Sequence, residues 1–182
     1  MTDNIANAER YLSTDELRDG RKVSIRAIRP EDKPILQESW HHLSRQSQYF
    51  RFFAEKDELT EQELEFFTDI DFVHHVGLLA SIINGDAEVP AGVGRYITAD
   101  VDTSSRSAEL AFVVVEEFQG LGIATILLKH LTQIARAEGI AEFTAFVLPE
   151  NRRMQTVLRK SGLSMNQVVN SVGVLEISLS LK

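Results

Sequence analysis

Residues 112–125 read FVVVEEFQGLGIAT, and this stretch indicates a strand that runs through a tight turn into a helix. The unbroken apolar run from Phe112 to Val115 contains three valines and suits a strand covered on both faces. Gly120 and Gly122 carry no side chain where the backbone must turn and where another group can approach closely. The stretch therefore predicts a strand, a glycine turn and a helix in direct succession.

Beyond the turn, apolar residues recur at spacings of three and four, which predicts a helix over residues 123–138 that Gly139 ends. The first N–H groups of such a helix have no partner inside it, and together with the helix dipole they favour an anion such as a phosphate. A Walker loop would place Gly-Lys-Ser/Thr here, but residues 121–123 read LGI. A dinucleotide fingerprint would need a third glycine where Thr125 stands. Neither nucleotide-binding pattern fits well.

The composition is that of one globular domain. The chain has 182 residues, enough for a substantial core, and its polar residues 1–9 are expected to form a loose N-terminal extension. It has no cysteine, which excludes disulfides, thiolate metal sites and a cysteine nucleophile. No apolar run approaches the length of a membrane span, and the N-terminus lacks the pattern of a signal peptide. We therefore expect a cytoplasmic protein without a membrane segment.

The formal net charge of −8 argues against a nucleic-acid-binding protein, which would normally present a basic face. An acidic surface suits cationic partners such as lysine side chains or polyamines, but the same charge would also keep an ordinary protein in solution. Both explanations stay open. The adjacent pairs His41-His42 and His74-His75 point in different directions on a regular element and lack accompanying ligands, so we predict no metal site.

The order of the predicted elements indicates an α+β fold with helices on both sides of one mixed sheet. A capping box at residues 60–63, TEQE, marks the start of one helix. Two strands are predicted within residues 9–28, and further strands over residues 76–83, 91–99, 107–115, 141–148, 164–170 and 173–181. Helices are predicted from Pro30, from Thr60, and over residues 123–138 and 151–161.

The pattern Gln119-x-x-Gly122-x-Ala124 resembles the acyl-CoA pyrophosphate loop of the GNAT superfamily of N-acetyltransferases, and the order of elements is similar to that of the GNAT fold. The resemblance implies a single N-acetyltransferase domain, with a central mixed, mostly antiparallel sheet of about seven strands flanked by about four helices. It also implies acetyl-CoA as the acyl donor. The residues that would contact acetyl-CoA are Phe112, Val113 and Val114 beside the pantetheine arm, and Gln119, Gly120, Leu121, Gly122, Ile123, Ala124 and Thr125 around the pyrophosphate.

Asn151 resembles the asparagine that opens the following GNAT helix and contacts the pantetheine arm, although asparagine is also a preferred N-cap. Many GNAT enzymes have a tyrosine about seven residues later that protonates the leaving thiolate. Here that position is Leu158, so the resemblance supplies no general acid at this position.

Four further segments resemble the acetyltransferase domain of bacterial Pat-type protein-lysine acetyltransferases. They are residues 26–32 (RAIRPED), 43–53 (LSRQSQYFRFF), 71–75 (DFVHH) and 92–96 (GVGRY). The resemblance implies a protein lysine as the amine acceptor. The ligase-like or nucleotide-binding modules that are often fused to such domains do not fit within 182 residues.

Glu109 is the candidate general base. A lysine ammonium has a pKa near 10.4, so removing its proton at neutral pH costs about 4–5 kcal/mol, and a carboxylate near the thioester carbonyl would meet that need. Residues 107–112 read SAELAF, and GNAT lysine acetyltransferases carry their base in a similar setting on the strand before the pyrophosphate loop. The alternative is that Glu109 lies at a solvated strand end and has no chemical role.

Two other functions stay open: acetylation of small amines, and a non-catalytic acyl-CoA-binding regulatory domain. The aromatic residues of segments 50–53 and 66–67 are assigned to the core or to a homodimer interface. Arg51 and Arg95 are expected to hold structural carboxylates, and we assign them no catalytic role.

Overall fold

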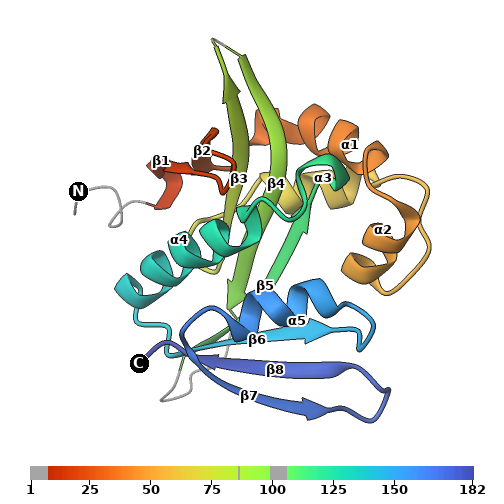
Figure 1. The fold of residues 1–182 in the computed structure, drawn as a ribbon, viewed down its shortest axis with the longest axis vertical. Coiled ribbons are helices and arrows are strands. Elements are labelled where there is room, and N and C mark those ends of the chain that lie inside the picture. The colour runs from red at the N-terminus through yellow and green to blue at the C-terminus, as the bar shows by residue number, and fades with distance from the viewer. Residues whose placement is uncertain (1–7, 86, 99–105) are drawn as a thin grey trace.

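The computed structural model describes residues 8–85, 87–98 and 106–182, which form one eight-stranded sheet with helices on both faces (Figure 1). The strands are β1 (Leu12–Glu16), β2 (Lys22–Ala27), β3 (His75–Asn84), β4 (Ala87–Thr98), β5 (Ser107–Val114), β6 (Glu142–Val147), β7 (Ser164–Val169) and β8 (Leu175–Ser180). The α-helices are α1 (Lys33–His41), α2 (Arg45–Phe52), α3 (Glu61–Thr68), α4 (Ile123–Ala137) and α5 (Arg152–Arg159). Short 3₁₀ turns cover Ala8–Arg10, Pro30–Asp32 and Glu116–Phe118.

The strand order is β1-β2-β3-β4-β5-β6-β8-β7, and every neighbouring pair is antiparallel except β5 and β6. The predicted α+β fold with a mixed, mostly antiparallel sheet is confirmed. The described residues contain one strand and one α-helix more than the approximate counts of seven and four. None of the helices in these residues is long and apolar enough to cross a membrane.

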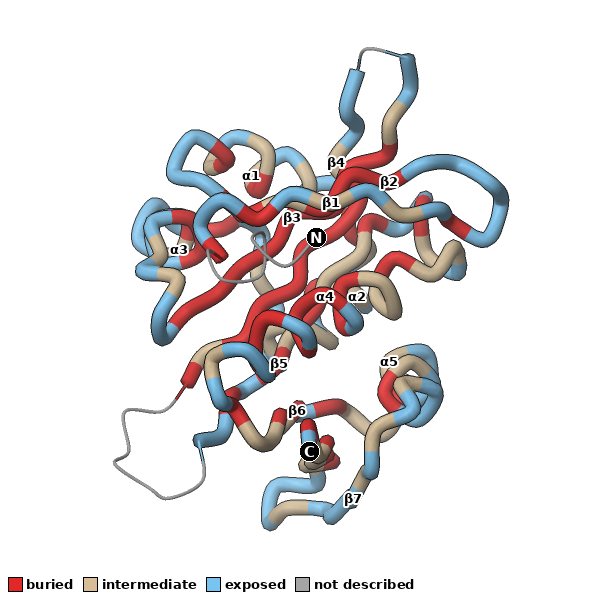
Figure 2. Tube along the Cα trace, turned by 90° about the vertical axis from the view of Figure 1, so that its left-hand side faces the viewer, coloured by how far each residue is buried: buried red, intermediate tan, exposed pale blue. Residues whose placement is uncertain are grey.

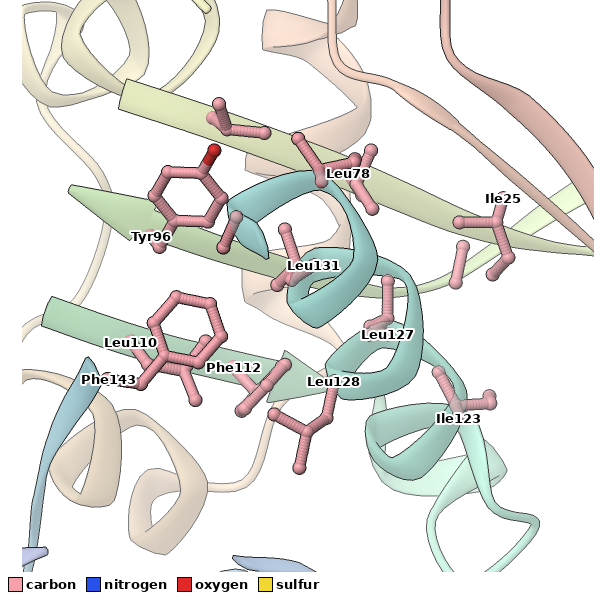
Figure 3. Packing of buried hydrophobic residues seen from close by; sticks show 14 of the residues in the cluster. Ile25, Leu78, Tyr96, Leu110, Phe112, Ile123, Leu127, Leu128, Leu131 and Phe143 are labelled. Atoms are coloured by element: carbon pink, nitrogen blue, oxygen red, sulfur yellow. The ribbon is translucent and has the colours of Figure 1, made fainter. Parts of the chain in front are cut away.

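The larger core lies between the sheet and α4. Ile123, Leu127 and Leu131 project from α4 toward the sheet, where Leu78 and Tyr96 meet them (Figure 3). Their spacing of four residues places them on one face of the helix, as the apolar period predicts. This packing fixes the start of α4, and with it the glycine turn, against the central strands.

A second core lies on the opposite face of the sheet, under α1 and α3. Trp40 and Phe67 project from these helices into a cluster that also contains Leu79 and Val93 of the sheet. Figure 2 shows the result, with buried residues concentrated in the central strands and exposed residues in the outer loops. The central strands β3 and β4 are therefore covered on both faces.

The capping box predicted at residues 60–63 is present. The Thr60 side chain accepts a hydrogen bond from the Glu63 amide at 3.3 Å, and the Glu63 carboxylate accepts one from the Thr60 amide at 2.8 Å. Two donors at the start of α3 are thereby satisfied. The local sequence alone therefore located this helix.

The predicted elements differ from the structure in three places. Helix α2 was not predicted, because its buried side is formed by Gln48 and not by an apolar row. Strand β4 begins at Ala87 instead of residue 91, and its pairing with β3 shifts register near Ala80. Strand β5 is buried on the side facing α4 but only half covered at Val113 on the other side, because a cavity lies there.

Candidate functional site

The sheet opens between its two parallel strands. Pairing of β5 with β6 covers three positions and ends where Glu109 lies opposite Thr144. Beyond this point β5 continues to Val114 with no strand on that edge, and β6 runs away from it at a wide angle (Figure 1). Backbone groups that face the opening have no ladder partner, so an extended molecule can bind there in the manner of an added strand.

The glycine turn lies at the far end of this opening. Gly120 and Gly122 have φ values of 84° and 100°, a conformation that glycine adopts without strain. Among the described residues, no group accepts a hydrogen bond from the amides of residues 120–125, and the first helical bond runs from Ile126 N to Gly122 O at 3.0 Å. Free amides at the start of a fifteen-residue helix are chemically suited to bind an anion.

Two arginines that the motif analysis did not identify flank this turn. The Arg18 guanidinium donates to the Gly120 carbonyl at 3.2 Å, and the backbone amide of Arg18 donates to the Leu121 carbonyl at 3.2 Å. Arg153, in the first turn of α5, donates to the side-chain oxygen of Gln119. Arg153 stands two residues after Asn151, so its position could have been noticed from sequence. Nothing in the sequence places Arg18 near a turn a hundred residues later.

Gln119 and Glu116 fasten the turn to neighbouring elements. The Gln119 amide donates to the Val114 carbonyl and to the Ser47 hydroxyl, both at 3.2 Å. The Glu116 carboxylate accepts from the Ser47 hydroxyl at 2.8 Å and from the Ser44 amide at 3.3 Å. The turn is therefore held against the start of α2, and the Gln119 side chain makes its hydrogen bonds to other residues of the protein.

Glu109 lies at the mouth of the opening. It is exposed, and it alternates with Leu110 so that it faces the same side of the sheet as Ala111 and Val113. Its negative charge raises the pKa of the Arg51 guanidinium, although burial has the larger effect and lowers that pKa overall. The carboxylate therefore stands between the opening and the face covered by α2 and α3.

A cavity of about 50 Å³ continues from this face into the second core. Arg51 and Arg95 line it together with aromatic side chains of α1 to α3. No carboxylate of the described residues lies within ion-pair distance of either arginine, so the expectation that both hold structural carboxylates is wrong. Arg51 lies over the rings of Phe52 and Phe67, and Arg95 lies over the Phe67 ring and donates to the Phe67 carbonyl. Apart from Ser39, the other side chains that line the cavity are apolar.

His75 lies behind Arg95. Arg95 Nη1 is 3.0 Å from His75 Nε2, and because guanidinium can only donate, the ring nitrogen accepts. Burial, and then the charges of Arg95 and Arg51, lower the pKa of His75 to about 4. The imidazole is therefore neutral at neutral pH and supports Arg95.

Asn151 and Leu158 have structural roles on α5. The Asn151 side chain accepts a hydrogen bond from the Met154 amide at 3.1 Å, so it caps the helix. Leu158 is fully buried in the larger core. No phenol stands at this position to protonate a leaving group.

Comparison with known proteins agrees with these features. The family model of the GNAT acetyltransferase domain matches residues 22–164. Acetyltransferase PA5475 of Pseudomonas aeruginosa is 30% identical over 142 residues, which are 78% of this chain and 74% of that protein. The crystal structure of the GNAT domain of S. lividans PAT superposes with a TM-score of 0.83 at 32% identity, and the match covers 93% of this chain and 96% of that one.

The fold also matches that of YncA from Salmonella typhimurium, solved with its cofactor acetyl-CoA. The TM-score is 0.69 at 18% identity, over 88% of this chain and 94% of that one. The strand, glycine turn and helix, the open sheet edge and the matched relatives lead to one assignment. The chain belongs to the GNAT acetyltransferase family.

Proposed function

We propose that this enzyme transfers an acetyl group from acetyl-CoA to the ε-amino group of a protein lysine, with Glu109 as general base. The observation that carries the proposal is the position of Glu109, whose carboxylate stands where β5 and β6 part. A thioester lying in the opening and an amine arriving from the face of α2 would meet beside it. The resemblance to Pat-type protein-lysine acetyltransferases, and the match to the GNAT domain of S. lividans PAT, favour a lysine acceptor.

In this proposal the turn holds the diphosphate of the cofactor. The free amides of residues 120–125 supply the donors, and Arg18 and Arg153 supply positive charge on either side. The pantetheine arm lies along Phe112, Val113 and Val114, where β5 has no partner strand on the open edge. Local donors of this kind can hold a polyanion in a protein whose net charge is −8.

The chemical step is a direct attack of the amine on the thioester. Glu109 removes one proton from the lysine ammonium, and the nitrogen lone pair then forms a bond to the carbonyl carbon. The carbon–sulfur bond breaks and the nitrogen loses its second proton to solvent, which gives the neutral amide and the CoA thiolate. Since the position equivalent to the usual tyrosine is the buried Leu158, solvent protonates the thiolate. A thiol of pKa about 8.5 is acidic enough to leave in this way.

Release of the CoA thiol tests the proposal. The protein is incubated with acetyl-CoA and lysine peptides, polyamines, or no acceptor. We expect release that depends on the lysine peptide, with acetyl-lysine found by mass spectrometry.

Two outcomes would replace the proposal. Release with polyamines alone would identify a small-amine acetyltransferase. Binding of acetyl-CoA without release under any condition would identify a regulatory acyl-CoA-binding domain. The cytoplasmic location and a homodimer stay part of the proposal, and the exposed rings of Phe53 and Phe66 are candidate contacts for a second copy.

A further inference from the structure

Two positively charged side chains, Arg51 and Arg95, line the cavity beside Glu109, and no carboxylate of the described residues lies within ion-pair distance of either. Arg95 is 6% exposed, and its Nη1 donates to the Phe67 carbonyl at 3.2 Å and to His75. Its Nε and Nη2 donate to no described residue. The Arg51 side chain makes no hydrogen bond with any described residue and lies over the rings of Phe52 and Phe67.

The two guanidinium groups share one aromatic wall. The central carbon of Arg95 lies 4.3 Å from the centre of the Phe67 ring, and that of Arg51 lies 5.8 Å from the same ring. Burial, and then the charge of Arg51, lower the pKa of Arg95 to about 9. Like charges repel each other, and the buried Arg95 and the partly buried Arg51 have lost hydration that they have in water, so an anion between them would stabilise both.

The cavity lies next to the proposed reaction centre. Arg95 is the cross-strand neighbour of Ala111, and Ala111 is two residues from Glu109 on the same face of the sheet. Ala111 and Val113 belong to both the cavity wall and the edge strand of the opening. If the acceptor amine lies at Glu109, other groups of the same acceptor molecule can therefore reach Arg51 and Arg95.

We propose that this cavity binds a carboxylate of the amine acceptor, held by Arg51 and Arg95. The inference rests on the proposed function and specifies its acceptor: a lysine whose peptide carries an acidic side chain or a free C-terminus close to the acetylated amine. Guanidinium groups bind carboxylates through paired N–H donors, and the unused donors of Arg95 are suited to this. A cavity of about 50 Å³ has room for a few water-sized groups, each needing roughly 10–15 Å³, which suits a carboxylate and excludes a large ring.

Matched lysine peptides test the proposal. One pair differs by Glu or Gln beside the lysine, and a second pair by a free or an amidated C-terminus. In the wild type we expect kcat/KM to be about 10- to 100-fold higher for at least one carboxylate peptide than for its amide, the range for a hydrogen bond to a charged group. In Arg51→Gln this ratio should fall to about one.

Arg45→Gln is the control, because Arg45 is on the same helix and forms only an exposed ion pair with Asp57 among the described residues. It should keep the wild-type ratio. The Arg51 side chain makes no hydrogen bond with the described residues, so Arg51→Gln is expected to fold, and its melting curve verifies this. A second readout needs no activity: glutarate should raise the melting temperature of the wild type more than its diamide does, and Arg51→Gln should abolish the difference.

The outcomes separate this inference from the proposed function. Equal kcat/KM for both members of each pair, with no glutarate effect, would overturn the carboxylate site and leave lysine acetylation standing. Absence of transfer to any peptide would overturn the proposed function, and the glutarate measurement would then decide the cavity alone. An Arg51-dependent preference for succinyl-CoA over butyryl-CoA would assign the carboxylate to the acyl chain and overturn the acceptor assignment.

Discussion

Glu109 lies opposite Thr144 at the last position where β5 and β6 pair, and beyond these two residues the parallel strands separate. Glu109 thus belongs to the part of β5 that is paired with β6, and its carboxylate lies next to the part where the two strands have separated. Its cross-strand neighbour on the other side is Ile97. A group in this position is fixed by the backbone on both sides and still accessible to a substrate.

Replacing Glu109 with glutamine should lower kcat at neutral pH by a factor on the order of 10²–10⁴, the usual contribution of a general base. Affinity for acetyl-CoA should not change, because the proposed diphosphate site is the glycine turn and not Glu109. Glu117→Gln is the control, since Glu117 is an exposed residue of the following turn. Steady-state kinetics from pH 7 to 9 measure the effect, and an unchanged kcat across this range would exclude Glu109 as the base.

Replacing Gly122 with alanine should weaken acetyl-CoA binding about tenfold. A side chain at a φ of 100° costs about 1–2 kcal/mol, so the turn would relax away from the geometry that presents its amides. Gly173 has a similar φ of 82°, and a Cβ there would have no neighbour within 4 Å, whereas a Cβ at Gly122 would only be in ordinary contact with Arg18 at 3.6 Å. Gly173 lies in the turn between β7 and β8. Gly173→Ala should lose about as much stability as Gly122→Ala and should keep the wild-type affinity for acetyl-CoA, as measured by calorimetry. Equal affinities for both variants and the wild type would contradict the assignment of the turn.

Replacing Asp32 with alanine should lower the free energy of unfolding by about 3 kcal/mol. Asp32 accepts two hydrogen bonds of 2.7 Å from Arg26, and the substitution would leave that partly buried guanidinium unpaired. Urea unfolding measures the loss. Asp19→Ala removes the exposed partner of Arg21 and should change stability far less. Similar losses in the two variants would show that burial of the Arg26 pair is unimportant.

Stability should fall on acidification partly through His75. Its pKa is about 4 in the folded protein and near 6.5 in the unfolded chain, so between these values the unfolded state binds more protons. The contribution of the neutral His75 to the free energy of unfolding is therefore complete above pH 6.5 and is lost as the pH falls toward 4. His75→Gln keeps an acceptor for Arg95 but cannot titrate.

Between pH 7 and 4 the wild type should therefore lose about 2 kcal/mol more than His75→Gln. Unfolding curves of both proteins at each pH measure this difference. Parallel loss of stability in the two proteins would show that His75 does not titrate between these limits.

Local signals in the sequence were sufficient for most of the fold. The capping box at Thr60 and the strand, turn and helix around Gly122 each depend on residues close together in the chain. Helix α2 lacked such a pattern, since its inward residue Gln48 is polar and is satisfied by a hydrogen bond to the Trp40 carbonyl. The cap at Ser44 was the one local signal for this helix.

The site was predictable where the chain forms it from one segment. The turn and Glu109 lie within seventeen residues of one another, so a motif could identify both. Arg18 reaches the turn from the loop between β1 and β2. Arg51 and Arg95 line the same cavity because α2 packs against β5, the strand next to β4. Such neighbours follow from tertiary packing, and no spacing in the sequence encodes them.

The hydrogen bonds of Glu116 connect the two halves of the site. The carboxylate holds Ser44 and Ser47 at the start of α2, and it also accepts from Gln119 at 3.2 Å, beside the amides of the turn. Since α2 carries Arg51, these hydrogen bonds would couple acetyl-CoA at the turn to the acceptor carboxylate at the cavity, if both proposed sites are correct. We therefore expect thermodynamic cooperativity. The factor by which acetyl-CoA changes the dissociation constant of the acceptor must equal the factor by which the acceptor changes the dissociation constant of acetyl-CoA.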